Sequence, residues 1–320
     1  MAALYTPKVK IAVASSFEGI VNNGAPECAL VSLNAYHEQN PSSFFERKLT
    51  ASEFNQSYRS ADAVQKFLAL RPLVEVAEDY RTVLDVIERY PAESGVFAAN
   101  PNDVKTYLFL AEKFNGLKQE KQEERDEFGK GKDSFFYKER RALQKAGYEA
   151  WLNTQAPFDD ALPQFRHLVE TQVWDGGEPV SGFFPRFATS KDEASTYALC
   201  RFYAAVKKLD VSDMEGTRCI IPRDGIIGME TVPSRNKVQQ LVVIADRLEV
   251  PRSQVWRLND RYDPRQQEEL FYNGFVYQFF VPGYAAPVEI ERARHDRFVR
   301  VLERKSFAQQ LAAYAEQWGF

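Results

Sequence analysis

Four places far apart in this chain of 320 residues carry side chains that could act together on a phosphate group. Each place follows a short apolar run or opens a helical pattern. They are Ser16-Phe17-Glu18-Gly19, Thr189-Ser190-Lys191, the stretch from Arg223–Asp224 to Lys237, and Asn259-Asp260-Arg261-Tyr262-Asp263. Hydroxyl and ammonium groups donate to phosphoryl oxygens, and carboxylates supply the hard oxygen ligands that Mg²⁺ prefers. The residue types therefore indicate phosphate and magnesium handling, provided that the fold brings them together.

The apolar runs that precede these residues predict strands that alternate with helices. The predicted strands are Val9–Ala14, Phe183–Ala188, Arg218–Ile221, Gln254–Leu258 and Phe275–Val281. Helical periodicity separates them over 194–206 and 238–248, and again from Pro264. This alternation predicts right-handed βαβ units and a parallel sheet, whose strand ends at one edge form the ligand site. The predicted fold class is α/β, with a Rossmann-like core of three α/β/α layers.

A long helical block interrupts this core. Helical periodicity dominates from Ala25 to about His167, which is far longer than an ordinary loop. We therefore predict a core of residues 1–21 and 176–286, an all-helical cap inserted over 22–175, and a helical tail over 287–320 that packs on the core. Capping-box patterns open helices at Thr50-x-x-Glu53 and Ser190-x-x-Glu193, and Ser306-x-x-Gln309 caps the tail.

Composition excludes several classes of protein. The net charge of −4 argues against a dedicated nucleic-acid binder. Cys28, Cys200 and Cys219 have no CxxC spacing, so no zinc knuckle or redox dithiol is expected, and their odd number fits a reducing compartment. The N-terminus lacks the apolar region of a signal peptide, and no apolar run is long enough to span a membrane. The expected location is cytoplasmic.

The order of these motifs resembles that of the haloacid dehalogenase-like (HAD) hydrolase superfamily. KIAVASSFEGIV stands where that family has hhhhDxDG. Thr189 in FFPRFATSKDE matches the family's Ser/Thr at a strand end, and Lys237 in SRNKVQQLVVIADRL matches its lysine. Asp260 and Asp263 in VWRLNDRYDP match its acidic cluster. The resemblance covers essentially the whole chain and implies a Rossmann-like fold with a helical cap.

The resemblance also implies roles for individual residues. Ser16 and Glu18 stand in place of the family's nucleophilic and acid/base aspartates, so the first motif is degenerate. With Thr189 and Lys237 they would form the catalytic set. Phosphate would be bound by Thr189, Ser190 and Lys237, and Mg²⁺ by Asp260, Asp263 and the backbone carbonyl of Glu18. The loss of the first aspartate weakens this metal site.

Three interpretations follow. In the first, the chain keeps the fold and pocket but has lost phosphoaspartyl chemistry, and acts in binding, scaffolding or regulation, with a protein partner at the cap or a small phosphorylated ligand. In the second, it is a Mg²⁺-dependent phosphohydrolase on a small phosphorylated metabolite. Ser16 or a metal-bound water would then attack, with Glu18 as acid/base, because a serine hydroxyl needs an adjacent base. In the third, an unrelated α/β protein uses these residues in ordinary turns.

Overall fold

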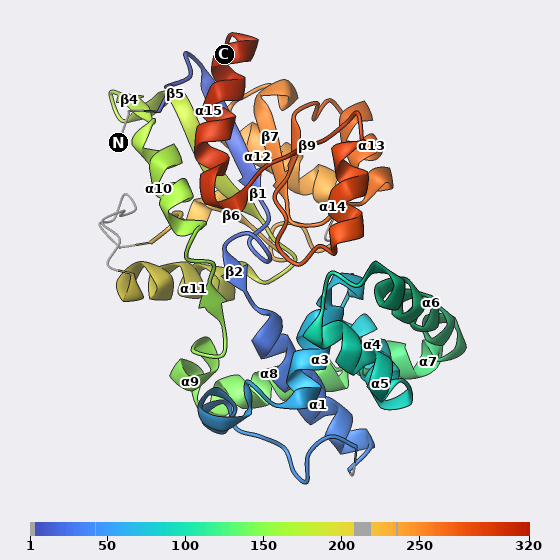
Figure 1. Ribbon diagram of the computed structural model, residues 1–320. Coiled ribbons are helices and arrows are strands. Elements are labelled where there is room, and N and C mark those ends of the chain that lie inside the picture. Colours follow the sequence, from blue (N-terminus) through green and yellow to red (C-terminus); the bar gives the residue numbers. More distant parts are fainter. Residues whose placement is uncertain (1–3, 42, 208–218, 235) are drawn as a thin grey trace. The chain divides into compact units, whose positions relative to one another are not determined.

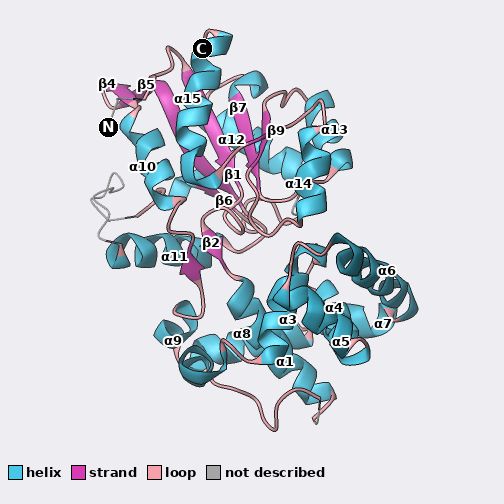
Figure 2. Cartoon of the chain, viewed as in Figure 1, coloured by secondary structure: helices cyan, strands magenta, loops and turns pink. Residues whose placement is uncertain are grey.

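The chain divides into two compact units in a computed structural model that describes residues 4–41, 43–207, 219–234 and 236–320. The sheet unit comprises the described residues of Met1–Asn23, Pro157–Ala285 and Glu289–Phe320. The helical unit comprises those of Gly24–Ala156 and Ala286–Val288. Figure 2 shows the strands of the large sheet gathered in one unit and helices in the other.

The sheet unit is built on a mostly parallel sheet. Among the described residues, seven strands run in the order β4-β5-β1-β7-β8-β9, with β6 paired to β5 beyond the end of β4. All pairs are parallel except β4 with β5. The bounds are β1 Lys10–Ser15, β4 Val173–Asp175, β5 Glu178–Ala188, β6 Ile226–Ile227, β7 Val255–Asn259, β8 Gln278–Phe280 and β9 Arg300–Val301. A separate pair is formed by β2 (Asn22–Asn23) and β3 (Ala156–Pro157).

Helices cover both faces of this sheet (Figure 1). One face packs Ala12, Phe184 and Val255 against Leu241 and Ile244 of α12, because alternate strand residues point to the same side. The opposite face packs against α10 and α15, where the ring of Phe165 lies 5.5 Å from Phe187 and 5.3 Å from Phe307. The predicted three-layer α/β class is confirmed. The helices are α10 Leu162–Glu170, α11 Glu193–Val206, α12 Lys237–Leu248, α13 Pro264–Tyr272, α14 Pro287–Arg294 and α15 Phe307–Trp318.

The helical unit contains the predicted insertion of helices. Its helices are α1 Ala25–Gln39, α2 Ala51–Glu53, α3 Asp62–Leu70, α4 Asp79–Arg89, α5 Pro91–Ala99, α6 Val104–Glu120, α7 Gln122–Gly129, α8 Phe135–Ala146 and α9 Tyr148–Leu152. The capping box of Thr50 and Glu53 is present at the start of α2, which continues as a π-helical turn over Phe54–Tyr58. Inside the unit the buried Glu27 accepts from Arg140 at 2.8 Å and from the indole of Trp151 at 3.1 Å.

The boundaries of the units differ from the predicted ones. Residues 157–175, predicted to lie in the insertion, belong to the sheet unit, because α10 packs on the sheet and β4 pairs with β5. The tail, predicted to be helical, contains β9, which pairs with β8 at the edge of the sheet. The predicted strand over 218–221 is wrong for Cys219–Ile221, and Arg218 lies outside the described residues. The strand comes later, at β6, where the short turn Arg223–Gly225 brings Ile226 and Ile227 beside β5.

Two of the predicted caps are also wrong. Asp192 rather than Ser190 caps α11, since its side chain accepts from the backbone N–H of Ser195 at 2.7 Å. Ser306 precedes α15, but its hydroxyl accepts from the Gln310 side chain instead of a backbone N–H. No helix among the described residues combines the length and apolarity required to cross a membrane.

Candidate functional site

The candidate site lies at the carboxyl ends of β1, β5 and β7. Ser15, at the end of β1, is in register with Phe187 of β5 on one side and with Leu258 of β7 on the other. The segments that follow these strands therefore leave the same edge of the sheet. Because β5 and β7 lie on opposite sides of β1, this edge contains a topological switch point, where parallel sheets bind ligands.

Ser16 is held between two side chains of β7. Its Oγ accepts a 2.9 Å hydrogen bond from Arg257 Nη2 and donates a 3.2 Å bond to Asn259 Oδ1. Its backbone N–H donates to the carbonyl of Leu258 at 3.0 Å. Asn259 is fixed in turn, because its Nδ2 donates to the Arg261 carbonyl at 2.7 Å. Both the position and the hydrogen-bonding capacity of the Ser16 hydroxyl are thus set by β7.

Arg257 places a positive charge inside the sheet unit. Its side chain is fully buried, and Nη1 donates to the Ala14 carbonyl at 3.1 Å while Nη2 also reaches Asn259 Oδ1 at 3.2 Å. Burial, opposed by the charge of Asp260, lowers the pKa of Arg257 to about 10, so the guanidinium remains charged at neutral pH. Sequence reasoning missed this residue. The available signal was a lone arginine within the apolar strand Val255–Asn259.

Glu18 is directed towards Lys191 and not towards Ser16. Its Oε1 lies 2.8 Å from Lys191 Nζ and accepts from Asn22 Nδ2 at 2.8 Å. The side chains of Glu18 and Lys191 are 20% and 13% exposed, so the ion pair is partly screened from water. The sequence places Lys191 in the segment Thr189-Ser190-Lys191, but the resemblance gives it no binding role. It is the lysine that the structure brings to the acidic residue of the first motif.

Thr189, Lys237 and Gln240 meet at the end of β5. Lys237 Nζ donates to the Ala188 carbonyl at 3.0 Å and to Gln240 Oε1 at 3.0 Å. The buried Gln240 donates to the Thr189 carbonyl at 2.7 Å, and Thr189 Oγ1 accepts from the backbone N–H of Lys191 at 3.1 Å. Lys237 and Thr189 are thus connected through Gln240, which contacts the backbone of Thr189 and not its hydroxyl. Ser190 is exposed.

The two predicted metal ligands after β7 have different environments. Asp260 is 7% exposed and lies against Gly19, where φ is +78° and an added Cβ would overlap the Asp260 carboxylate. Gly283 packs equally closely on the backbone of Gly19. Asp263 instead caps α13, since its Oδ1 accepts from the N–H of Arg265 at 3.0 Å. A helix cap stabilises the helix end and leaves Asp263 a structural role.

These residues do not fit a Mg²⁺ ion. A magnesium site needs near-octahedral oxygen donors, normally including carboxylates. Of the predicted ligands, Asp263 caps a helix, which leaves the carboxylate of Asp260 and the backbone carbonyl of Glu18. Ser16 adds only a neutral oxygen, which already accepts from a guanidinium. Within the part of the chain that the structure describes, no group of three or more His, Cys, Asp or Glu side chains could hold a metal ion. The buried charge of Arg257 adds electrostatic repulsion towards a divalent cation beside Ser16.

Comparison of this chain with known proteins finds similar solved structures but no similar sequence family. No protein-family model matches the chain, and no curated protein matches it. A haloacid dehalogenase-like hydrolase from Bacteroides fragilis is similar at 14% identity and a TM-score of 0.44, covering 94% of this chain and 99% of its own. A predicted phosphatase from Clostridium acetobutylicum is similar at 10% identity and a TM-score of 0.43, covering 97% and 100%. A defluorinating L-2-haloacid dehalogenase is similar at 11% identity and a TM-score of 0.40, covering 97% and 99%. Identities and TM-scores this low carry no argument about the function of this chain.

Proposed function

We propose that this chain is a HAD-like protein that has lost phosphoaspartyl hydrolase chemistry and binds a small phosphorylated ligand without hydrolysing it. One observation carries the proposal: the Ser16 hydroxyl, at the position of the family's nucleophile, is held between the guanidinium of Arg257 and the amide of Asn259. The order of β5, β1 and β7 around the strand-end edge supports a ligand site there.

The surroundings of Ser16 oppose its use as a nucleophile. A serine attacks phosphorus only when a neighbouring base accepts its proton. The acceptor of the Ser16 proton is the amide oxygen Asn259 Oδ1, which is not a base at neutral pH. Glu18, the base that the sequence suggested, is paired with Lys191. The Ser16 oxygen also accepts a hydrogen bond from Arg257, which reduces the nucleophilicity of this oxygen.

The end of β5 keeps groups suited to an anion. Lys191 and Lys237 bring two ammonium groups to this strand end, and the Thr189 hydroxyl lies between their segments. Ammonium and hydroxyl donors recognise phosphoryl oxygens without changing them. The ion pair with Glu18 holds the ammonium group of Lys191 at the candidate site. A ligand phosphate would compete with the Glu18 carboxylate for this ammonium group. Binding is therefore the chemistry that this arrangement supports best.

Two measurements test the proposal. In the first, the natural protein is assayed for p-nitrophenyl phosphate turnover with Mg²⁺, beside its Asp260→Ala variant. We expect no difference between them. Turnover by the natural protein above that of the variant would overturn the proposal and support the Mg²⁺-dependent phosphohydrolase.

The second measurement is the shift in melting temperature with inorganic phosphate. We expect a saturable rise for the natural protein that is lost in Lys191→Met. The matched control is Lys207→Met, because Lys207 is also paired with a carboxylate, Asp159 at 2.7 Å, but lies at the end of α11. Absence of a rise in the natural protein, or equal rises in all three proteins, would contradict the binding role.

A further inference from the structure

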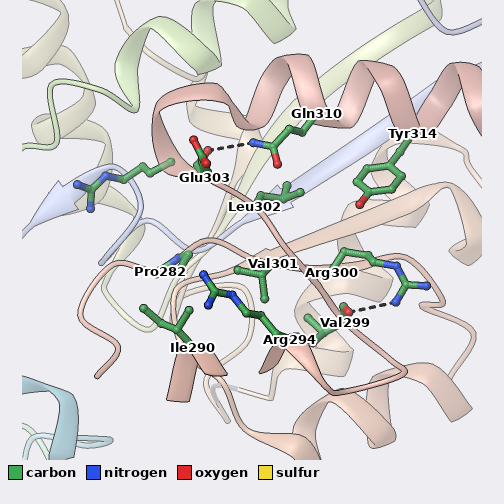
Figure 3. Close-up of a pocket in the computed structure, with 11 residues that line it drawn as sticks. Pro282, Ile290, Arg294, Val299, Arg300, Val301, Leu302, Glu303, Gln310 and Tyr314 are labelled. Carbon is green, nitrogen blue, oxygen red and sulfur yellow. Dashed lines mark hydrogen bonds between the residues drawn. The ribbon is translucent and has the colours of Figure 1, made fainter. Parts of the chain in front are cut away.

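A groove of about 680 Å³ lies beside the edge strand β9 of the sheet unit (Figure 3). It is formed by the segment after β8, by α14, by β9 and by α15, and so does not include the strand-end site. This volume is in the range of pockets that hold small organic ligands. Nothing in the proposed function uses this groove.

One part of the groove is apolar. Its apolar surface comes from the partly exposed side chains of Ile290, Val301 and Tyr314, whereas Val299 and Leu302 are 3% and 1% exposed and lie beneath that surface. The ring of Tyr314 stacks on Trp318, with centroids 4.8 Å apart, which fixes its position on α15. Such a surface gains free energy when an apolar ligand body displaces water from it.

The polar lining is mainly cationic. Within the described residues, the charged side chains that line the groove are Arg294, Arg300, Arg304 and Glu303. Arg304 is turned to Asp160, 2.7 Å away, and its guanidinium lies 4.0 Å from the ring centroid of Phe158. Arg294 contacts the exposed Glu291 at 3.0 Å. Each of these two arginines is therefore paired with a carboxylate, which leaves Arg300, among the described lining residues, as the cation that can attract an anion.

Arg300 is the best-placed binding group. Its Nη1 donates to the Val299 carbonyl at 3.2 Å, and no carboxylate pairs with it among the residues that the structure describes. Figure 3 shows the guanidinium of Arg300 below Tyr314 and that of Arg294 at the Ile290 side of the groove. A planar guanidinium binds a carboxylate or phosphate with two parallel hydrogen bonds.

We propose that this groove binds a small organic anion whose carboxylate or phosphate group meets Arg300 while its apolar body covers Val301 and Tyr314. The charge of Arg300, unpaired among the described residues, selects an anion, and the partly exposed apolar side chains select a ligand with a hydrocarbon or aromatic part. The inference is independent of the chemistry at Ser16, because the two sites share no residue.

The test uses 8-anilinonaphthalene-1-sulfonate, an aromatic anion whose fluorescence rises in an apolar site. We expect saturable binding of one molecule per chain, with an affinity at least about tenfold weaker in Arg300→Gln, as for loss of a charged hydrogen bond. Phenylacetate should displace the probe, whereas benzyl alcohol, its neutral counterpart, should displace it much less. Circular dichroism checks that each variant is folded.

Two controls locate the probe. Arg297→Gln removes an exposed guanidinium that stacks on Phe298, 4.6 Å away, and does not line the groove, so its affinity should match that of the natural protein. Lys191→Met alters only the strand-end site and should also leave the affinity unchanged. Unaltered binding by Arg300→Gln, or equal displacement by phenylacetate and benzyl alcohol, would overturn the proposal.

Discussion

The guanidinium of Arg257 donates a 2.9 Å hydrogen bond to the hydroxyl of Ser16, across 241 positions of sequence. Both side chains are buried. Arg257 lies on β7, and Ser16 directly follows β1, the parallel strand beside it. A carboxylate at position 16 would meet the charge of Arg257 and pair with it. Ser16 and Arg257 therefore form one hydrogen-bonded unit at the end of the sheet.

Replacing Arg257 by lysine should lower the free energy of unfolding by about 1–3 kcal/mol, because an ammonium cannot reach both the Ala14 carbonyl and Ser16 Oγ in the planar geometry of a guanidinium. Urea unfolding measures the loss. Arg252→Lys is the control, since Arg252 is exposed and donates to one carbonyl, that of Asn273. Equal effects of the two substitutions would show that Arg257 has no special role.

Mg²⁺ should not stabilise Ser16→Asp, because the new carboxylate would pair with Arg257. In the double variant Ser16→Asp/Arg257→Met this competitor is gone, while Asp260, whose charge acts on Arg257 in the natural protein, remains. We expect Mg²⁺ to stabilise the double variant by about 1.4 kcal/mol at ten times its Kd. Melting temperatures with and without Mg²⁺ give the comparison, with Arg257→Met as control. A Mg²⁺ response of the single variant Ser16→Asp would refute the blocking role of Arg257.

Gly19→Ala should destabilise the chain for two reasons. Gly19 has φ +78°, which costs an alanine about 1–2 kcal/mol. The Cβ of the new alanine would also overlap the side chain of Asp260, and this overpacking should add about 1–3 kcal/mol to the loss of stability. Gly177→Ala is the matched control, because φ is +88° there and nothing lies within 4 Å of an added Cβ. Thermal unfolding that shows equal losses in the two variants would exclude the contact with Asp260 as a cause.

The phenol of Tyr262 should lose its proton at a higher pH than an ordinary tyrosine. Burial, then its 2.8 Å hydrogen bond to Asp296 Oδ2, raises the pKa of Tyr262 from 10.0 to about 12. Since the folded pKa is above the unfolded one, its contribution to stability is fully present below pH 10 and is lost as pH rises through 12. Ultraviolet titration of the phenolate should show this late step, with Tyr262→Phe identifying it.

The same titration in Asp296→Asn should occur at lower pH, because the carboxylate that stabilises the protonated phenol is gone. Stability measured between pH 10 and 12 should fall less steeply in Tyr262→Phe than in the natural protein. A late step that is unchanged in Asp296→Asn would leave burial alone as its cause.

Much of the core was predictable because its signals are local. The runs that became β1, β7 and the second half of β5 are mainly apolar, and α12 begins at Lys237 as its pattern indicates. The first half of β5, residues 178–182, carries no such run, so the sequence does not predict it. The short strands were harder. β6 and β9 have two residues each, too few for periodicity, and they exist because neighbouring strands offer them partners. The boundary at residue 175 was wrong for the same reason, since β4 is defined by its pairing with β5.

Local sequence patterns are enough to predict the alternation of strands and helices and the polar segments that follow β1, β5 and β7. Tertiary structure decided which side chains meet. Glu18 pairs with Lys191, Asp263 caps its own helix, and Arg257 reaches Ser16 from the adjacent strand. The physical reason is one of range. Periodicity reflects the burial of residues close in sequence, whereas a hydrogen bond between strands depends on their order and register, which arise only when the sheet forms.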